Sequence, residues 1–336
     1  MNPDRPAPCP VASPLTTPGR ALLRTLALSV ALSFCFVSAA PGQATPAALP
    51  LQPVAEGVWF AQGDSAQGSA ANRNFISNAG VVLTPAGVVL IDALGSPALA
   101  EELLAAVARL TPLPVKAVIV THYHADHIYG LQVFKDRGAQ IIAHDAGRLY
   151  LTSETAALRL AASREELFPW VDEKTRLQPA DRWVQGSERF ELGGEAFQLR
   201  HAGPAHTPED LVVMHERSGV MFSGDLVFRG RIPFVGQADS RHWIRALGEL
   251  IALQPRVVVP GHGPLSRQPQ QDLTFTRDYL QHLRTSMGEA AAQLEPFDEA
   301  YARTDWSAYA GMPLFRAANR MNAYNTYLLL EQTGGR

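Results

Sequence analysis

The chain has 336 residues, of which 46% are hydrophobic and 18% charged, and its formal net charge at pH 7 is −3. This composition supports a buried core and excludes intrinsic disorder, which combines low hydrophobicity with high net charge. The balance of 29 basic and 32 acidic residues argues against nucleic-acid binding, which requires a basic surface.

Residues 1–44 are predicted to be a secretory signal peptide with its cleavage region. Two arginines precede an apolar run, Leu26–Val37, and small residues follow it. The run has 12 residues, which is short for a membrane-spanning helix, although a retained anchor is the alternative. Both cysteines, Cys9 and Cys35, lie in this segment. We therefore expect a periplasmic or secreted protein that is not stably inserted in a membrane and whose mature part has no cysteine.

The rest of the chain is predicted to form a short linker at 45–53 and a single domain over 54–336. The folded part begins at Val54–Ala61, and further strands are expected at Phe75–Leu83, Val88–Asp92, Val115–Val120, Ala139–Ala143, Phe190–Leu192, Phe197–Arg200, Leu211–His215, Val220–Ser223 and Val257–Val259. Helices are expected after the cap Ser96 and Pro97, at Ile128–Arg137, over most of an insert at 146–180, near Arg241–Leu253, and at 270–293 and 317–331. Two strand-rich halves with helices outside them predict a four-layer αββα sandwich, an α/β fold.

Four residues of metal-ligand type follow the expected strand Val115–Val120 directly. They are His122, His124, Asp126 and His127. Imidazole and carboxylate groups are the usual nitrogen and oxygen ligands of zinc. Because side chains alternate along an extended chain, the first three are expected to point the same way. A histidine-rich surface loop is the alternative interpretation.

Three more residues of this type follow later strands. His206, Asp225 and His262 each come after the end of an expected strand, with a glycine nearby that allows close backbone approach. Loops at strand ends converge at one edge of a sandwich, so these residues are expected to join the first four in a metal site.

These motifs resemble the metallo-β-lactamase superfamily over nearly all of residues 54–265. The resemblance rests on the His-x-His-x-Asp-His motif at 122–127, on His206, on the Gly-Asp pair at 224–225 and on the Gly-His-Gly turn at 261–263. It implies the αββα fold of that superfamily and a metal-dependent hydrolase acting on a small molecule. It does not specify the substrate.

The resemblance also implies a site for two zinc ions. His122, His124 and His206 would hold one ion, Asp126, His127 and His262 the other, and Asp225 would bridge them. The catalytic residues would be Asp225 and Asp126. Of these, Asp126 could orient the attacking water by accepting its hydrogen bond. An aspartate at position 225 is similar to glyoxalase II and related thioester or ester hydrolases, whereas true metallo-β-lactamases usually lack it.

The implied reaction is metal-assisted hydrolysis. Two zinc ions roughly 3.5–4 Å apart lower the pKa of a shared water toward ~7, and the resulting hydroxide attacks an ester, thioester or amide-like carbonyl. Within the superfamily, the export signal and the segments 225–233 and 322–325 resemble SoxH-like periplasmic hydrolases, a group associated with sulfur oxidation and quinoprotein pathways.

Three other functions remain open. The first is a persulfide-dioxygenase-like enzyme with one non-haem iron, held by His122, His206 and Asp225. The second is β-lactam hydrolysis, expected to be weak because of Asp225. The third, a metal-binding protein without catalysis, is disfavoured because the ligand set is intact.

Several residues outside the ligand set also have expected roles. Asp92 ends a strand beside the motif and is expected to orient a ligand histidine, with a turn or helix cap as the alternative. Arg229 and Arg231 either meet an anionic substrate or form a solvated pair. Residues 62–74 are interpreted as a mobile loop at the mouth of the site, and 146–180 as a lid. His144 is expected to be structural, and the oligomeric state is left open.

Overall fold

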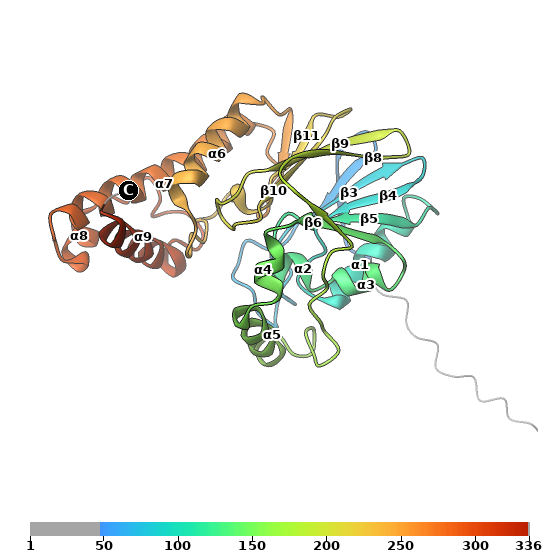
Figure 1. The fold of residues 1–336 in the computed structure, drawn as a ribbon, viewed down its shortest axis with the longest axis horizontal. Coiled ribbons are helices and arrows are strands. Elements are labelled where there is room, and N and C mark those ends of the chain that lie inside the picture. Colours follow the sequence, from blue (N-terminus) through green and yellow to red (C-terminus); the bar gives the residue numbers. More distant parts are fainter. Residues whose placement is uncertain (1–47, 335–336) are drawn as a thin grey trace, which may run out of the picture. The chain divides into compact units, whose positions relative to one another are not determined.

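The computed structural model describes residues 48–334, all within one compact unit, Thr45–Arg336. The expected signal peptide at 1–44, with both cysteines, lies outside the described residues. Across residues 48–334, no helix combines the length and apolar character needed to cross a membrane. The strands form two sheets with helices on their outer faces (Figure 1).

The first sheet contains seven strands in chain order. They are β1 (Leu51–Ala55), β2 (Val58–Ala61), β3 (Ala79–Thr84), β4 (Gly87–Ile91), β5 (Val115–Ile119), β6 (Gln140–His144) and β7 (Arg182–Val184). The first four pair antiparallel, and β4 to β7 are parallel. The carboxyl ends of the parallel strands therefore meet at one edge of the sheet.

The second sheet contains five strands in the order β12-β11-β10-β9-β8. They are β8 (Glu188–Leu192), β9 (Glu195–His201), β10 (Leu211–His215), β11 (Val220–Phe222) and β12 (Val257–Val259). β11 and β12 are parallel, and β10 is antiparallel to both β9 and β11. The strands β9, β11 and β12 thus run in the same direction and end at the same edge.

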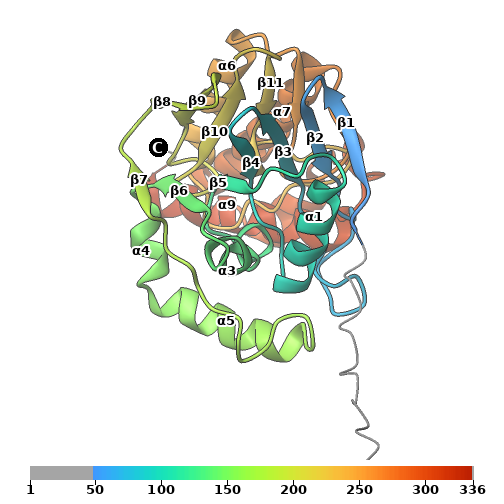
Figure 2. The same cartoon turned by 90° about the vertical axis from the view of Figure 1, so that its right-hand side faces the viewer.

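Residues of β4 show why the sheets lie in the middle of the fold. Val88 and Leu90 pack with α1 on the outer side of the first sheet, whereas Val89 and Ile91 pack between the two sheets. Both faces of the strand are covered, so every position is apolar. A third core joins the outer face of the second sheet to α6 and α7. The layers are therefore αββα, as the sequence predicted (Figure 2).

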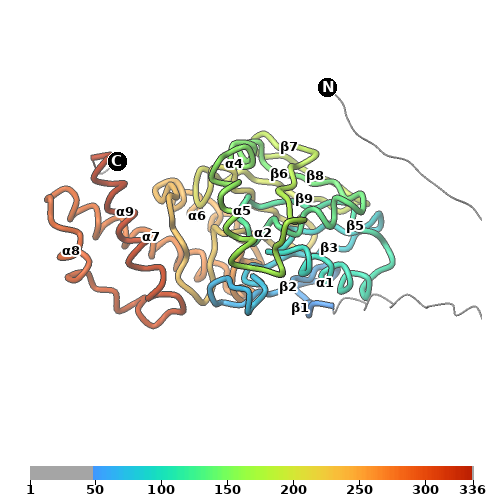
Figure 3. Tube along the Cα trace, turned by 90° about the horizontal axis from the view of Figure 1, so that it is seen from below, coloured from blue at the N-terminus to red at the C-terminus, as the bar shows by residue number. Residues whose placement is uncertain are grey.

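The helices follow the expected order. They are α1 (Pro97–Ala108), α2 (Ala125–Ile128), α3 (Leu131–Lys135), α4 (Gly147–Leu151), α5 (Glu154–Glu166), α6 (Ser240–Ala252), α7 (Pro269–Ala292), α8 (Phe297–Arg303) and α9 (Arg320–Thr333). Ser96 caps α1 by accepting a hydrogen bond from the Leu99 N–H. The helices α7, α8 and α9 lie together at the end of the unit away from α1 (Figure 3).

Several expectations about elements need correction. β1 begins at Leu51, inside the expected linker 45–53, and the strand expected at Phe75–Leu83 begins only at Ala79. The helix α8 was not expected. The expected helix Ile128–Arg137 is divided into α2 and α3, because the Gly130 N–H donates to the Leu94 carbonyl and not along the helix. A Cβ at Gly130 would also lie 2.0 Å from the Ala93 oxygen, so only glycine fits this close packing.

The insert at 146–180 is helical only in its first part. Helices α4 and α5 end by Glu166, and the chain then runs without regular structure to β7, a strand that the sequence pattern did not reveal. Pro169 and Pro179 interrupt this stretch, and Asp172 forms a turn with Thr175. Proline lacks the N–H that a helix requires, which explains the early end of the helical part.

Candidate metal centre

All seven candidate ligands lie where strand ends of both sheets converge. The segment 121–127 follows β5, His206 follows β9, Asp225 follows β11 and His262 follows β12. The Leu211 N–H at the start of β10 donates to the Thr121 carbonyl at 2.8 Å, which joins the two sheets beside the motif.

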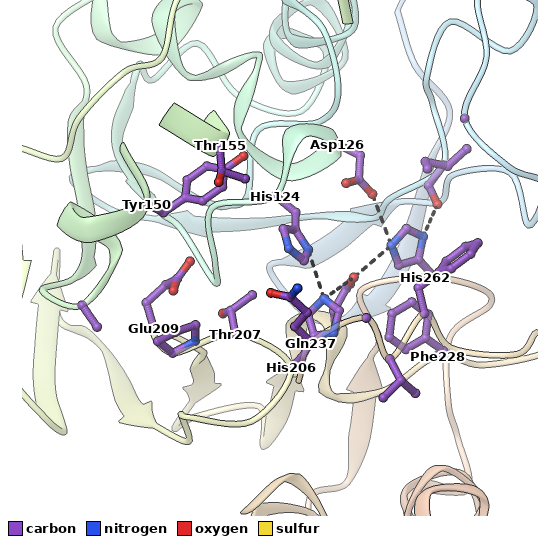
Figure 4. A pocket seen from close by; sticks show the side chains of 18 of the residues that line it. His124, Asp126, Tyr150, Thr155, His206, Thr207, Glu209, Phe228, Gln237 and His262 are labelled. Carbon is purple, nitrogen blue, oxygen red and sulfur yellow. Dashed lines mark hydrogen bonds and ion pairs between the residues drawn. The ribbon is translucent and has the colours of Figure 1, made fainter. Parts of the chain in front are cut away.

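One group of donor atoms comes from four of these residues. Those of His122, His124, His206 and Asp225 all lie within 4.8 Å of one another. His206 Nε2 is 3.0 Å from His124 Nδ1 and 3.4 Å from Asp225 Oδ2 (Figure 4). His122 Nε2 lies 3.7 Å from the same carboxylate oxygen.

The other three residues form a second group. His262 Nε2 is 3.2 Å from Asp126 Oδ2, and His127 Nε2 is 3.6 Å from it. Asp225 also reaches this group, with Oδ1 3.2 Å from His127 Nε2 and Oδ2 3.3 Å from His262 Nε2. The Asp225 carboxylate therefore lies between the two groups of donors.

Asp126 reaches the cluster by a different route from the one expected. His124 has an extended backbone, with φ −84° and ψ 149°, but Asp126 lies in the first turn of α2. Strand alternation therefore does not explain its direction. The strand β5 ends at Ile119 and the helix α2 begins at Ala125, so residue 126 is no longer extended.

Contacts behind the cluster orient the ligand histidines. Asp92 Oδ2 is 2.8 Å from His127 Nδ1, and its carboxylate also accepts hydrogen bonds from the N–H and hydroxyl of Thr121. His262 Nδ1 donates to the Ile76 carbonyl at 2.8 Å. Both histidines consequently present Nε2 to the centre, as ligand histidines with such partners do. This geometry supports the orienting role expected of Asp92.

The charges of the first donor group suit cation binding. Burial, and then the neighbouring His127, hold the pKa of His122 well below its usual value, and burial lowers the pKa of His206 to about 3. These imidazoles are neutral at pH 7 and keep a free lone pair. Burial alone would raise the pKa of Asp225, but His262, His127 and His122 hold it well below its usual range. The aspartate is therefore ionised.

Unsatisfied polar atoms indicate that the cluster is built for a metal. His122 Nε2, His127 Nε2 and Asp225 Oδ1 are buried without a hydrogen-bond partner, and all belong to the two donor groups. Such atoms are costly unless something binds them. A cluster of imidazole nitrogens and carboxylate oxygens fits zinc, and also iron.

Gly261 allows Asp225 to reach its position. A Cβ on Gly261 would lie 2.0 Å from Asp225 Oδ1 and 2.6 Å from the Gly224 carbonyl carbon. The Gly261 N–H donates to the Gly224 carbonyl at 2.8 Å. The close approach of these two loops requires glycine, as its place beside His262 suggested.

A cavity of about 610 Å³ opens onto the cluster. The loop 62–74 contributes Gln67 and Gly68, and α4 contributes Leu149 and Tyr150. Both segments expected near the mouth of the site therefore line it. Trp170, from the second half of the insert 146–180, contacts the loop 62–74: its indole N–H donates to the Ala70 carbonyl at 2.8 Å.

The two arginines after Asp225 have different surroundings. Arg229 lies outside this cavity, and its Nε donates to Asp272 at 2.7 Å. Arg231 lines the cavity and is 1% exposed. The tyrosines that flank the ligands do not line it: Tyr123 stacks on Trp183, and Tyr129 is buried beside Ser163.

Three residues near the site were not identified from the sequence. Glu209 is 3% exposed, lines the cavity and accepts a hydrogen bond from the Tyr123 N–H. Asp210 accepts hydrogen bonds from the N–H and hydroxyl of Thr207, next to His206. The acidic pair 209–210 just after His206 was the available signal for both. Asn78 donates to the Pro260 and Gly263 carbonyls, and nothing in its local sequence indicates this.

Comparisons with known proteins agree with this geometry. The family model described as the metallo-beta-lactamase superfamily matches residues 72–262. The probable metallo-hydrolase YqjP of Bacillus subtilis is 26% identical over 191 residues, which cover 49% of this chain and 59% of YqjP. The linear primary-alkylsulfatase of a Pseudomonas strain is 24% identical over 239 residues, covering 60% of this chain and 45% of that enzyme.

The solved structures show the same fold. The sec-alkylsulfatase Pisa1 of a Pseudomonas species is similar, with a TM-score of 0.65 and 17% identity over 84% of this chain and 50% of Pisa1. The chain spans about half the length of these relatives. The family match over most of the described domain, together with the histidine and aspartate cluster, shows that the chain is an enzyme of the metallo-beta-lactamase superfamily.

Proposed function

We propose that this chain is an exported hydrolase that uses two zinc ions to cleave an ester, thioester or amide-like carbonyl bond. The observation that carries the proposal is the position of Asp225. Its two oxygens lie 3.2 to 3.7 Å from histidines of both donor groups, as expected of a residue that bridges two ions.

The donor set divides evenly between two ions. His122, His124 and His206 would hold one, and Asp126, His127 and His262 the other. Bound zinc would supply Lewis acidity toward the substrate carbonyl and lower the pKa of a water molecule.

Asp126 is suited to orient the attacking water. Its carboxylate lines the cavity and lies at the edge of the second donor group. Burial would raise its pKa, but His127 and His262 lower it, so the group is ionised at pH 7. An ionised carboxylate accepts a hydrogen bond from water and so fixes the direction of its lone pair.

The second donor group favours hydrolysis over iron-dependent oxygenation. A mononuclear iron enzyme of the persulfide-dioxygenase kind would need only His122, His206 and Asp225. Such enzymes share all seven ligand positions but would leave the second group unused, whereas a binuclear hydrolase would use Asp126, His127 and His262, whose donor atoms gather within 4.8 Å. β-Lactam hydrolysis is proposed only as a weak side reaction, because of Asp225.

Sulfate-ester hydrolysis is a second candidate. The alkylsulfatase match extends over 60% of this chain, against 49% for YqjP. A sulfate ester would use the same cluster but present a sulfate group in place of a carbonyl group. A panel of substrates that contains both kinds of ester separates the two candidates.

Zinc-loaded protein lacking residues 1–44 should be assayed against 4-nitrophenyl butyrate, an acyl thioester, 4-nitrophenyl sulfate, nitrocefin and glutathione persulfide with oxygen. We expect hydrolysis of the ester or thioester, and loss of nearly all of it in His124→Ala. His242→Ala changes a histidine on α6 outside the cavity and serves as the control. Cleavage of the sulfate alone would favour the second candidate. Oxygen uptake by an iron-loaded sample, without hydrolysis, would overturn the proposal.

Export is proposed from residues 1–44, and the SoxH-like assignment from the segments 225–233 and 322–325. Fractionation of cells that produce the full chain tests the first. A protein confined to the cytoplasmic fraction would contradict it.

A further inference from the structure

One wall of the cavity at the metal cluster is a loop without regular structure. Residues 233–237 lie between β11 and α6 and belong to no strand or helix. Four of them, Phe234, Val235, Gly236 and Gln237, line the cavity, and Gln237 is drawn in Figure 4. Because this loop lies outside both sheets, no strand ladder holds it, and its backbone N–H and carbonyl groups need partners elsewhere.

Asn322 of α9 is the partner of two of these backbone groups. Its side chain is buried, with 1% of the residue exposed. Asn322 Oδ1 accepts a hydrogen bond from the Val235 N–H at 2.9 Å, and Nδ2 donates to the Pro233 carbonyl at 2.7 Å. An N–H can only donate and a carbonyl can only accept, so these two contacts fix the orientation of the amide. Loss of the amide would leave both loop groups buried without a partner, which is costly.

A hydroxyl group on α7 fixes Asn322 from the other side. Asn322 Nδ2 also donates to the Tyr279 hydroxyl at 2.9 Å, and that hydroxyl donates to Asn319 Oδ1 at 2.9 Å. The Asn319 amide then donates to the Tyr301 hydroxyl at 3.1 Å. Within the described part of the chain, Asn319 is thus hydrogen-bonded to two tyrosines, and only Asn322 of this buried network reaches the loop.

Asn325 contacts the same loop from the next turn of α9. Its Nδ2 donates to the Gly236 carbonyl at 3.1 Å. Residues three apart on a helix lie on the same face, so α9 turns two asparagines toward residues 233–237. The contact between Asn322 and Pro233 also joins the segments 225–233 and 322–325, which are far apart in the sequence.

We propose that Asn322 is a positioning residue of the active site, which holds the loop 233–237 in place as a wall of the substrate cavity. None of the seven candidate metal ligands comes from this loop or from α9. The loop therefore contributes to substrate binding, while the metal cluster is held by other contacts. This inference rests on the proposed hydrolase function and identifies a part of the chain, beyond the family match at 72–262, on which its substrate affinity depends.

Enzyme kinetics test the positioning role. Zinc-loaded Asn322→Ala should have a KM for 4-nitrophenyl butyrate about 5- to 30-fold higher than wild type, because two backbone groups of the loop lose their partner. Its kcat and zinc content should change little, since the metal ligands keep their contacts. Asn325→Ala is a milder variant, because it removes one hydrogen bond at a partly exposed position, and it should raise KM about 2- to 5-fold.

Asn319→Ala is the matched control. It removes the same side chain from the same buried network but takes no partner from the loop. Both Asn319→Ala and Asn322→Ala should unfold at a lower temperature than wild type, because each leaves a buried hydroxyl with one partner fewer. Only Asn322→Ala should have a raised KM.

Hydrogen exchange follows the loop without any substrate. In zinc-loaded protein, mass spectrometry of residues 232–238 should show faster exchange in Asn322→Ala than in wild type, because the Val235 N–H loses its acceptor. The same residues should exchange at the wild-type rate in Asn319→Ala.

These measurements separate two kinds of failure. If the wild type does not hydrolyse the ester, but residues 232–238 exchange faster in Asn322→Ala and not in Asn319→Ala, the positioning role stands and the proposed reaction is wrong. If exchange is unchanged in Asn322→Ala, or if Asn319→Ala raises KM as much as Asn322→Ala does, Asn322 is only a structural residue and the inference is overturned.

Discussion

At the scale of single residues, the contacts behind the cluster decide how well it can bind metal. Asp92 shows this most clearly. It is 3% exposed, has a φ of 64°, and divides its carboxylate between His127 and Thr121. One side chain therefore fixes both a ligand ring and the start of the motif.

Asp92→Asn should weaken zinc binding about 10- to 100-fold, the usual cost of losing a partner behind a metal ligand. Asparagine accepts the left-handed backbone at this position, so the fold should be kept. Competition with a chromophoric chelator measures the affinity. Asp136→Asn, at the surface position that pairs with Arg176, is the control. Unchanged zinc affinity in Asp92→Asn would show that Asp92 is only a turn residue.

The sequence predicted the convergence of the seven candidate ligands better than it predicted the rest of the cavity. Spacing and strand ends were enough to bring His206 and His262 to the motif. By contrast, nothing in the sequence separates Arg229 from Arg231, because their difference depends on Asp272, far along the chain. Glu209 was missed although the acidic pair 209–210 follows His206, since its neighbours Tyr123 and Tyr150 come from other elements.

At the scale of elements, strands with both faces covered were the easiest to predict. β10 and β12 begin and end at the expected residues. Elements whose limits depend on tertiary contacts were harder. Gly130 packs on the 93–95 loop and divides a helix, and β7 has only three residues.

A stack of two histidines links the edges of the two sheets and gives a prediction about acid stability. His144 ends β6 and His201 ends β9, and their ring centres are 3.6 Å apart. Burial, and then the neighbouring His201, lower the pKa of His144 to about 4 from 6.5. As the pH falls, the unfolded chain therefore binds a proton at His144 before the folded chain does. The contribution of neutral His144 to the free energy of unfolding is present above about pH 6.5 and is lost as the pH falls toward 4.

His144→Gln should remove part of this acid sensitivity. Between pH 7.5 and 5.0, metal-free wild type should lose about 1 kcal/mol more unfolding free energy than the variant, after allowance for solvent screening. Denaturant titration at both pH values measures this difference. Since the ligand histidines titrate in both proteins, their effect cancels in the comparison. Equal losses in the two proteins would contradict the account.

At the scale of the whole molecule, composition and strand order were sufficient for the layered architecture. The apolar runs and the two sets of helices predicted αββα, and the three cores show why each layer is needed. The function of α7 to α9 was not predictable in the same way. They complete the outer core of the second sheet and lie beyond the family match at 72–262, and the segment 322–325 in α9, although it carries a resemblance, indicates no role for them.

The central claim is that the two donor groups bind two zinc ions joined by Asp225. The measurement that tests it most directly is the number of zinc ions per chain after chelation and reconstitution, determined by elemental analysis. We expect about two in the wild type and in His242→Ala, and about one in His124→Ala. A wild-type chain that binds one ion, prefers iron, or keeps its full content in His124→Ala would contradict the account.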